Sequence, residues 1–221
     1  MTVDAIIFDF DGVLVESEYV SAAQLATGFT EIGRPTTIEQ SLDRFMGLSG
    51  ANLIAALEAH FGGPIPDAFS KAREAEDARV LSEGLEAVAG AIAFVRAMPA
   101  MLPRAIASSS TTHWIDTHLD HLELRDAFAS HIYSGREHVT RGKPAPDIYL
   151  YAAAQLGVSI ARCAIIEDSP VGVRGAVASG ARVIGLAVGR HCVDGHDAKL
   201  HAEGATEIAH SFAEVTAFLQ S

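Results

Sequence analysis

The chain has 221 residues, 49% of them hydrophobic, and its 28 acidic residues against 16 basic ones give a formal net charge of −12. That length allows one large domain or two small ones with a buried core, and the hydrophobic content excludes a disordered chain. The negative charge argues against a non-specific binder of nucleic acid or of anionic membranes, and no apolar run approaches the roughly 20 residues that cross a bilayer.

The cysteines and the first residues predict a cytoplasmic protein. Cys163 and Cys192 are far apart and lack the spacing of a metal site, which is typical of free thiols in a reducing compartment. No basic-then-apolar leader opens the sequence, because acidic Asp4 stands directly beside the first apolar run. We expect a monomer or a weak homodimer in the cytoplasm.

Short apolar runs alternate with helical patterns over most of the chain. Buried parallel strands are predicted at Val3–Phe8, Arg104–Ala107, Cys163–Glu167 and Ala181–Leu186, with a weaker candidate at Ile132–Tyr133. The helical patterns between them cover Val88–Ala97, Thr111–His121, Asp147–Leu156 and Val171–Ser179. This alternation predicts the fold class, an α/β protein with a doubly wound parallel sheet.

One segment interrupts the alternation. From Glu18 to Ser82 the pattern is helical throughout, as in "ANLIAALEAHFGG" and "AFSKAREAEDARVL", and about 65 residues pass without a strand candidate. An all-helical insert directly after the first strand predicts a second, small domain. We therefore expect a helical cap at residues 17–83 and an α/β core made of residues 1–16 and 84–221, with a hinge at each junction.

Polar side chains stand where several of the predicted strands end. In an open α/β sheet, ligands bind at the carboxyl ends of the strands. Four separate segments therefore deliver carboxylates, hydroxyls and an ammonium group to one edge of the sheet. These residues are Asp9 and Asp11, Ser108 and Ser109, Lys143 in the loop "TRGKPAPD", and Glu167 with Asp168.

This combination of groups is typical of phosphate chemistry. Asp9, Asp11 and Asp168 are hard oxygen donors of the kind that Mg²⁺ takes. Ser108 and the amides after it stand at a predicted helix N-terminus, which can hold phosphate oxygens, and Lys143 adds positive charge. A carboxylate beside the metal ion can attack phosphorus and form an aspartyl-phosphate, while a neighbouring carboxylate moves protons.

Four motifs resemble those of the haloacid dehalogenase superfamily of phosphotransferases. They are "DFDGVLVES", "IASSS", "GKPAPD" and "IIEDS", in that order between about Val3 and Leu186. The likeness is to the branch with a helical cap after the first strand, which includes β-phosphoglucomutase-like enzymes and sugar phosphatases. The resemblance implies an α/β core, a mobile cap and a Mg²⁺ cofactor.

The resemblance also implies a role for each motif residue. Asp9 would be the nucleophile and a Mg²⁺ ligand, and Asp11 the general acid/base, which also binds the metal ion through its carbonyl oxygen. Ser108, Ser109 and Lys143 would bind the phosphate group. Asp168 would be a Mg²⁺ ligand, and Glu167 beside it would support that ligand.

Within that superfamily, the residue two positions after the nucleophile separates the reactions. Asp11 supplies an acid there, as a phosphate monoester requires, because it protonates the leaving alkoxide and then activates water. We therefore predict a Mg²⁺-dependent phosphatase, and not a dehalogenase, that acts on a small phosphorylated metabolite such as a sugar or sugar-acid phosphate. The cap residues expected to bias substrate choice are Ser17, Ser49 and Asn52.

Two alternatives stay open. Ser17 and the cap loop "GLSG" also fit a mutase of the β-phosphoglucomutase type. The mutases that the chain resembles carry a histidine where this chain has Ser21, and an arginine that holds a second phosphate where it has Gly50; both departures favour the phosphatase. A non-catalytic binding protein with the same fold is the other alternative, against which the intact acidic motif residues argue.

The tail "GRHCVDGHDAKLHAEGATEIAH" contains His191, Cys192, His196 and His201. None of their spacings is the i, i+4 pair of a helical metal site, and glycines interrupt the segment. The sequence favours a mobile loop followed by an exposed final helix over a metal site.

Overall fold

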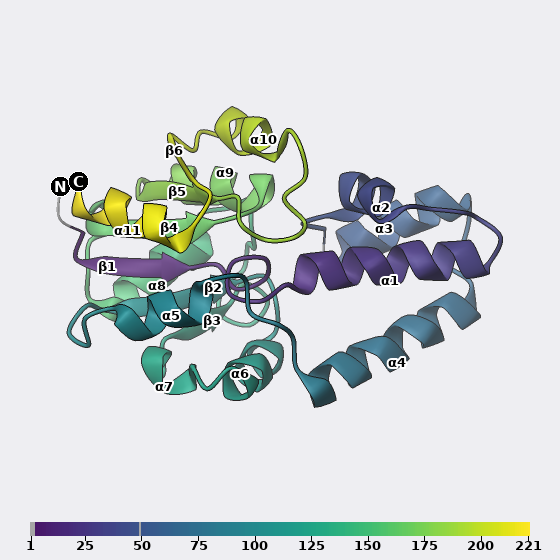
Figure 1. Ribbon diagram of the computed structural model, residues 1–221, viewed down its shortest axis with the longest axis horizontal. Coiled ribbons are helices and arrows are strands. Elements are labelled where there is room, and N and C mark those ends of the chain that lie inside the picture. The colour runs from purple at the N-terminus through teal and green to yellow at the C-terminus, as the bar shows by residue number, and fades with distance from the viewer. Residues whose placement is uncertain (1–2, 49) are drawn as a thin grey trace.

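Residues 3–48 and 50–221 are described by the computed structural model of the chain. At its centre is a six-stranded sheet with the order β3-β2-β1-β4-β5-β6, in which all neighbouring strands run parallel (Figure 1). The strands are β1 (Ala5–Phe8), β2 (Arg104–Ser108), β3 (Ile132–Ser134), β4 (Cys163–Glu167), β5 (Arg182–Leu186) and β6 (Glu207–Ala209). The strand order reverses direction at β1, so the predicted doubly wound α/β fold is confirmed.

Helices cover both faces of this sheet. They are α5 (Ala91–Ala97), α6 (Thr112–His121), α7 (Arg125–Phe128), α8 (Asp147–Leu156), α9 (Pro170–Ser179), α10 (His196–Ala202) and α11 (Phe212–Gln220), with a short 3₁₀ turn at Ile160–Arg162. Successive residues of a strand point to opposite faces. Accordingly, Ile6 and Phe8 of β1 join the hydrophobic cluster with α5, α6, α7 and α11, whereas Ala5 and Ile7 join the cluster with α8, α9 and α10.

The carboxyl ends of the central strands lie level with one another. Phe8, the last residue of β1, is in register with Ile106 of β2 and Ile166 of β4. The Asp9 amide continues the pairing, since it donates to the carbonyl oxygen of Ile166 at 3.0 Å. The residues that follow these three strands therefore meet at one edge of the sheet.

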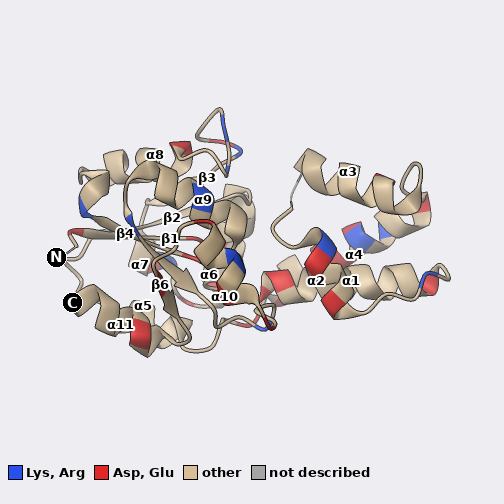
Figure 2. Cartoon of the chain, turned by 90° about the horizontal axis from the view of Figure 1, so that it is seen from above, with Lys and Arg blue, Asp and Glu red and all other residues tan. Residues whose placement is uncertain are grey.

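Four helices stand beyond that edge, and both views show them apart from the sheet (Figures 1 and 2). They are α1 (Ser17–Glu31), α2 (Ile38–Phe45), α3 (Gly50–Phe61) and α4 (Asp67–Glu83). Their buried side chains form a separate hydrophobic cluster around Phe29, whose ring lies 5.0 Å from that of Phe69 and 5.6 Å from that of Phe45. We propose on this basis that residues 17–83 fold as a cap on a core of residues 1–16 and 84–221.

The carboxyl-terminal part of the chain differs from the prediction. In place of a mobile loop and one final helix, residues 187–221 contain α10, β6 and α11, and both His191 and His196 are buried. Strand β6 has only three residues and pairs with β5 alone, so it has too few residues to show the alternation that reveals a strand in a sequence. Within the described residues, none of the helices has the length and apolar character needed to cross a bilayer.

The aromatic cluster predicts that the four helices depend on Phe29. Phe29 is fully buried, so Phe29→Ala should lower the free energy of unfolding by about 3–5 kcal/mol. Hydrogen exchange should show protection lost first in α1 to α4 and retained in β1 and β4. Ile54→Ala, at a side chain that is 51% exposed on α3, is the control and should change stability by less than about 0.5 kcal/mol. Equal loss of protection in the sheet would contradict a separate cap.

Candidate active site

A cavity of about 300 Å³ lies between the carboxyl edge of the sheet and the helices α1, α2 and α4. Because the strands end level with one another, the residues that follow them line its floor. Five of the predicted site residues are among them, and Ser17 at the start of α1 lines it from the opposite side. The five are Asp9, Asp11, Ser108, Ser109 and Lys143.

The Lys143 ammonium group joins two carboxylates at the end of the central strands. Its Nζ lies 2.7 Å from Asp9 Oδ1 and 2.6 Å from Glu167 Oε1, and its side chain is only 4% exposed. Burial by itself would lower the pKa of Lys143, but the charges of Asp9 and Glu167 outweigh it and hold the pKa well above its usual value. The Tyr149 hydroxyl also donates to Glu167 Oε1, at 2.6 Å. Lys143 is therefore a fixed, permanently charged cation beside Asp9.

Three carboxylates meet behind this ammonium group. Asp9, Glu167 and Asp168 each place an oxygen within 4.8 Å of the others. Burial first, and then the charge of Glu167, raises the pKa of both Asp9 and Asp168. His191 Nε2 lies 2.8 Å from Asp168 Oδ2, whereas Oδ1 of this side chain, which is 1% exposed, has no hydrogen-bond partner among the described residues. A hard divalent cation fits this site, because it would supply the missing ligand interaction and offset the repulsion among the acids.

Gly12 makes room for this arrangement. Its φ is +78°, and a Cβ atom at this position would lie 2.0 Å from Asp168 Oδ2. A side chain would therefore displace the carboxylate as well as strain the backbone. The glycine of the "DFDG" motif is explained by this close approach.

Asp11 lies on the other side of the cavity floor, bound to the segment after β2. Its Oδ2 accepts hydrogen bonds from Ser108 Oγ at 3.2 Å and Ser110 Oγ at 2.6 Å, and its Oδ1 accepts one from Trp114 Nε1 at 3.1 Å. The Asp11 side chain is thus separated from the group of three carboxylates. Its acid/base role stays a prediction, which this placement suits because its side chain is free of the proposed cation.

Of the residues expected to select the substrate, one lines the cavity and another does not. Ser17 lines the cavity, whereas Asn52 is exposed on α3 and is not among the described residues that line it. Ser49 lies outside the described residues. Two arginines that sequence reasoning missed, Arg73 of α4 and Arg136 after β3, do line the cavity.

Glu18 of α1 is a further cavity residue that the sequence did not single out. Its Oε2 accepts a hydrogen bond from the Gly47 amide at 3.4 Å, which links α1 to the chain after α2. Burial first, and then the charge of Asp168, raises the pKa of Glu18 to about 7. Its charge therefore changes within the physiological range of pH, at the wall of the cavity.

Comparison with known proteins identifies the family to which this site belongs. A family model described as haloacid dehalogenase-like hydrolase matches residues 3–180. The chain belongs to this family. The predicted membership is thus confirmed, and the four motifs that carried the resemblance all lie at the edge of the sheet described above.

Several relatives of this haloacid dehalogenase-like hydrolase are named as phosphatases. The 6-phosphogluconate phosphatase of Escherichia coli (strain K12) is 26% identical over 209 residues, which cover 94% of this chain and 91% of that protein. The phosphorylated carbohydrates phosphatase of Thermotoga maritima is 32% identical over 187 residues, covering 80% and 82%. A family hydrolase of Deinococcus radiodurans, solved with bound phosphate and sodium, is 33% identical with a TM-score of 0.82 and coverage of 98% and 95%. The chain is accordingly a phosphoric monoester hydrolase.

The raised pKa of Glu18 predicts a pH-dependent penalty on anionic substrates. The carboxyl group is neutral below a pH of about 7 and charged above it. The charged form should repel a phosphate ester at a cost on the order of 1 kcal/mol, or about fivefold in KM. We therefore measure KM for p-nitrophenyl phosphate in the wild type and in Glu18→Gln. The ratio of the wild-type KM to the KM of the variant should rise by about fivefold between pH 6 and pH 8.

The ratio of the two KM values removes the effect of substrate ionisation, which is the same for both proteins. The glutamine side chain keeps an oxygen that can accept the hydrogen bond of the Gly47 amide. Glu31→Gln, at the exposed far end of α1, is the matched control and should leave the ratio independent of pH. A flat ratio for Glu18→Gln would show that Glu18 does not titrate in this range.

Proposed function

We propose that the chain is a Mg²⁺-dependent phosphatase that hydrolyses a small sugar or sugar-acid phosphate through an aspartyl-phosphate on Asp9. The observation that carries the proposal is the position of the Asp9 carboxylate, which lines the cavity while Lys143 holds one of its oxygens at 2.7 Å. The phosphatase relatives support the same chemistry, since those named above act on 6-phosphogluconate and on phosphorylated carbohydrates.

In this mechanism Lys143 fixes Asp9 and offers positive charge to the incoming phosphate group. With Oδ1 bound to the ammonium group, the second oxygen of Asp9 attacks phosphorus, so that a P–O bond forms and the bond to the substrate oxygen breaks. Asp11 protonates the leaving alkoxide, and its carboxylate then takes a proton from the water that hydrolyses the aspartyl-phosphate. Ser108 and Ser109, at the floor of the cavity, are proposed to bind the phosphate oxygens.

The metal ion would be held by Asp9 and Asp168, with Glu167 supporting Lys143 and the Asp11 carbonyl oxygen as a further ligand. When bound, Mg²⁺ supplies positive charge that neutralises the phosphate and the crowded carboxylates. The observation in favour of this arrangement is Asp168 Oδ1, which is buried and accepts no hydrogen bond from the described residues.

The proposed cap would exclude water from the cavity and bind the part of the substrate that carries no transferred phosphate group. Its residues line one side of the cavity, so closure of residues 17–83 over the edge of the sheet would enclose a bound ester. The two positions at which related mutases carry a histidine and an arginine are occupied here by Ser21 and Gly50, and both line the cavity without a charged group. These two substitutions depart from the mutase pattern and favour hydrolysis, although Arg136 Nη2 would lie 4.0 Å from a Cβ atom at Gly50 and supplies a cation beside that position.

Arg73 favours a substrate with a second negative charge. Its Nη1 is buried without a hydrogen-bond partner among the described residues, although Asp77, one turn further along α4, also lines the cavity. An unpaired guanidinium nitrogen is costly to bury unless an anion occupies it. The carboxylate of a sugar acid would provide a two-oxygen partner suited to its planar donors.

The nucleophile is tested by Asp9→Asn. The amide cannot form an aspartyl-phosphate, so turnover of any phosphate ester should fall below detection while the far-ultraviolet circular dichroism spectrum is retained. Phosphate release by the wild type and the variant is followed with Mg²⁺ over a panel of sugar, polyol and nucleotide monophosphates. Asp126→Asn, at an exposed residue of α7, is a matched carboxylate-to-amide control. Retained phosphate release by the Asp9 variant would defeat the assignment.

The substrate class is tested by Arg73→Met. Loss of a charge-assisted hydrogen bond costs about 1.5–3 kcal/mol, so kcat/KM for 6-phosphogluconate should fall by roughly 10- to 100-fold. The value for glucose 6-phosphate, which has no carboxylate, should change by less than about threefold. Arg79→Met is the control on the same helix, since Arg79 is paired with Glu76 and Glu83. Equal losses for both substrates would exclude recognition of a carboxylate by Arg73.

A further inference from the structure

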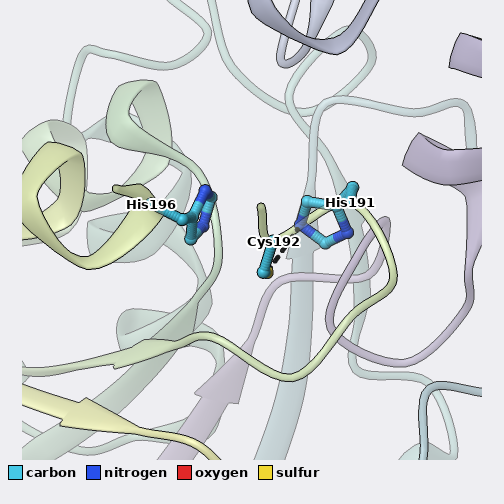
Figure 3. A group of neighbouring side chains, drawn as sticks. All are labelled: His191, Cys192 and His196. Carbon is cyan, nitrogen blue, oxygen red and sulfur yellow. Dashed lines mark hydrogen bonds between the residues drawn. The ribbon is translucent and has the colours of Figure 1, made fainter. Parts of the chain in front are cut away.

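A second group of metal-binding side chains lies behind the candidate active site. His191 and Cys192 belong to the chain between β5 and α10, His196 is the first residue of α10, and the three side chains are neighbours (Figure 3). One ligand atom from each lies within 4.8 Å of the other two. These three residues differ chemically from the group of three carboxylates. They offer two imidazole nitrogens and one sulfur, which are softer ligands than carboxylate oxygens.

The His196 ring is oriented as a metal ion requires, whereas His191 Nε2 lies 2.8 Å from Asp168 Oδ2, so His191 can bind an ion through Nε2 only when its ring proton is on Nδ1. His191 is fully buried and His196 is 3% exposed. His196 Nε2 lies 2.7 Å from the carbonyl oxygen of Asp168, which can only accept a hydrogen bond. Nε2 therefore carries the proton, and Nδ1 of the neutral ring keeps its lone pair. A metal-binding histidine is usually oriented in this way, by a hydrogen bond from its other nitrogen to a carbonyl oxygen.

The spacing is close to that of a zinc site. Bonds of about 2.0–2.1 Å to nitrogen and about 2.3 Å to sulfur place two donor atoms of a tetrahedral site about 3.4–3.6 Å apart. Cys192 Sγ and His191 Nε2 are 3.4 Å apart. The ligand atom of His196 lies within 4.8 Å of the other two, so an approach of little more than about 1 Å would complete this spacing.

The loop that presents these residues is tied to the rest of the molecule. The Arg190 amide donates to the buried Glu16 carboxylate at 2.9 Å, and the Cys192 amide donates to the carbonyl oxygen of Gly189 at 2.9 Å. A Cβ atom at Gly189 would lie 2.5 Å from His191 Nδ1, so only glycine leaves room for the ring. The donors are therefore positioned before any ion arrives, which lowers the entropy lost on binding.

We propose that His191, Cys192 and His196 form a binding site for Zn²⁺ or a similar soft divalent ion, and that an ion bound there inhibits the enzyme through Asp168. Burial raises the pKa of the Cys192 thiol, so the thiol is protonated in the free protein. Binding forms the metal–sulfur bond and releases that proton to the solvent.

Inhibition follows from the two contacts with Asp168. His191 Nε2 lies 2.8 Å from Asp168 Oδ2, and His196 Nε2 lies 2.7 Å from its carbonyl oxygen. An ion bound to His191 Nε2 would replace the contact of this nitrogen with Oδ2, and Oδ2 could then take the fourth ligand position. Asp168 would then be drawn away from Asp9 and Glu167, so the soft ion would compete for a ligand of the proposed Mg²⁺ site without entering it.

Binding is tested with Co²⁺ as a spectroscopic probe, added to metal-free protein in an excess of Mg²⁺ that occupies the hard site. The wild type should bind one Co²⁺ per chain with a thiolate-to-cobalt charge-transfer band, and calorimetry in buffers of different ionisation heat should show release of one proton. Cys192→Ser should abolish the band, and His196→Gln should weaken Co²⁺ binding by roughly 100-fold. Cys163→Ser and His201→Gln, which alter the other cysteine and the remaining histidine of this segment, should leave the band unchanged.

A band that persists in Cys192→Ser, or that is absent from the wild type, would overturn the site. The inhibitory effect rests on the proposed function and is measured separately, with p-nitrophenyl phosphate and saturating Mg²⁺. The Zn²⁺ concentration for half inhibition should be roughly 100-fold higher for Cys192→Ser than for the wild type. Equal inhibition of the wild type and Cys192→Ser would mean that Zn²⁺ acts at the carboxylates, and would overturn the proposed effect of the second site on Asp168. The cobalt band tests the existence of the second site even if the protein has no phosphatase activity.

Discussion

The ion pairs of Lys143 with Asp9 and Glu167 are the interaction on which the site depends. Two carboxylates at the ends of neighbouring strands, β1 and β4, are forced together by the level ends of the sheet. Both are buried, so without a cation between them one would have to bind a proton. The ammonium group at 2.7 Å and 2.6 Å satisfies both. The ammonium group of Lys143 thereby holds the Asp9 carboxylate at the cavity, which is the position that the proposed nucleophile requires.

Asp168 has a different position in this network, because it is almost fully buried and its Oδ1 accepts no hydrogen bond from the described residues, while its Oδ2 lies 2.8 Å from His191 Nε2. Its oxygens face the two hard carboxylates on one side and His191 on the other. A buried carboxylate of this kind is stable only with a cation nearby. The donor atoms on its two sides differ in softness, so the identity of the ion decides which group Asp168 joins.

The cavity also shows why hydrolysis of a polar ester suits this architecture. Its floor comes from rigid strand ends, whereas its opposite wall comes from helices with their own hydrophobic cluster around Phe29. Under the proposed function, chemistry and selection of the substrate would therefore be carried by different parts of the chain. Charged groups on the helical side, Glu18 and Arg73 among them, can change without disturbing the carboxylates and Lys143.

The sequence by itself was sufficient to predict five of the six strands of the sheet, the helical segment after β1 and the residues on the cavity floor. Asp9, Asp11, Ser108 and Lys143 could be found because each stands in a motif at the end of a buried apolar run or in the loop before a helix, and the topology of a parallel sheet brings such positions to one edge. Their meeting is thus a consequence of strand periodicity, which is visible in a sequence.

Only the tertiary structure decided which helical and loop residues join them. Arg73 and Glu18 reach the cavity through the way α1 and α4 pack, and Asn52 on α3 does not, although all three are polar residues in helical patterns. His191, Cys192 and His196 were dismissed because their spacing matches no helical metal motif, yet a turn before α10 brings them together. The physical reason is that a loop has no period, so the direction of its side chains depends on contacts distant in the chain.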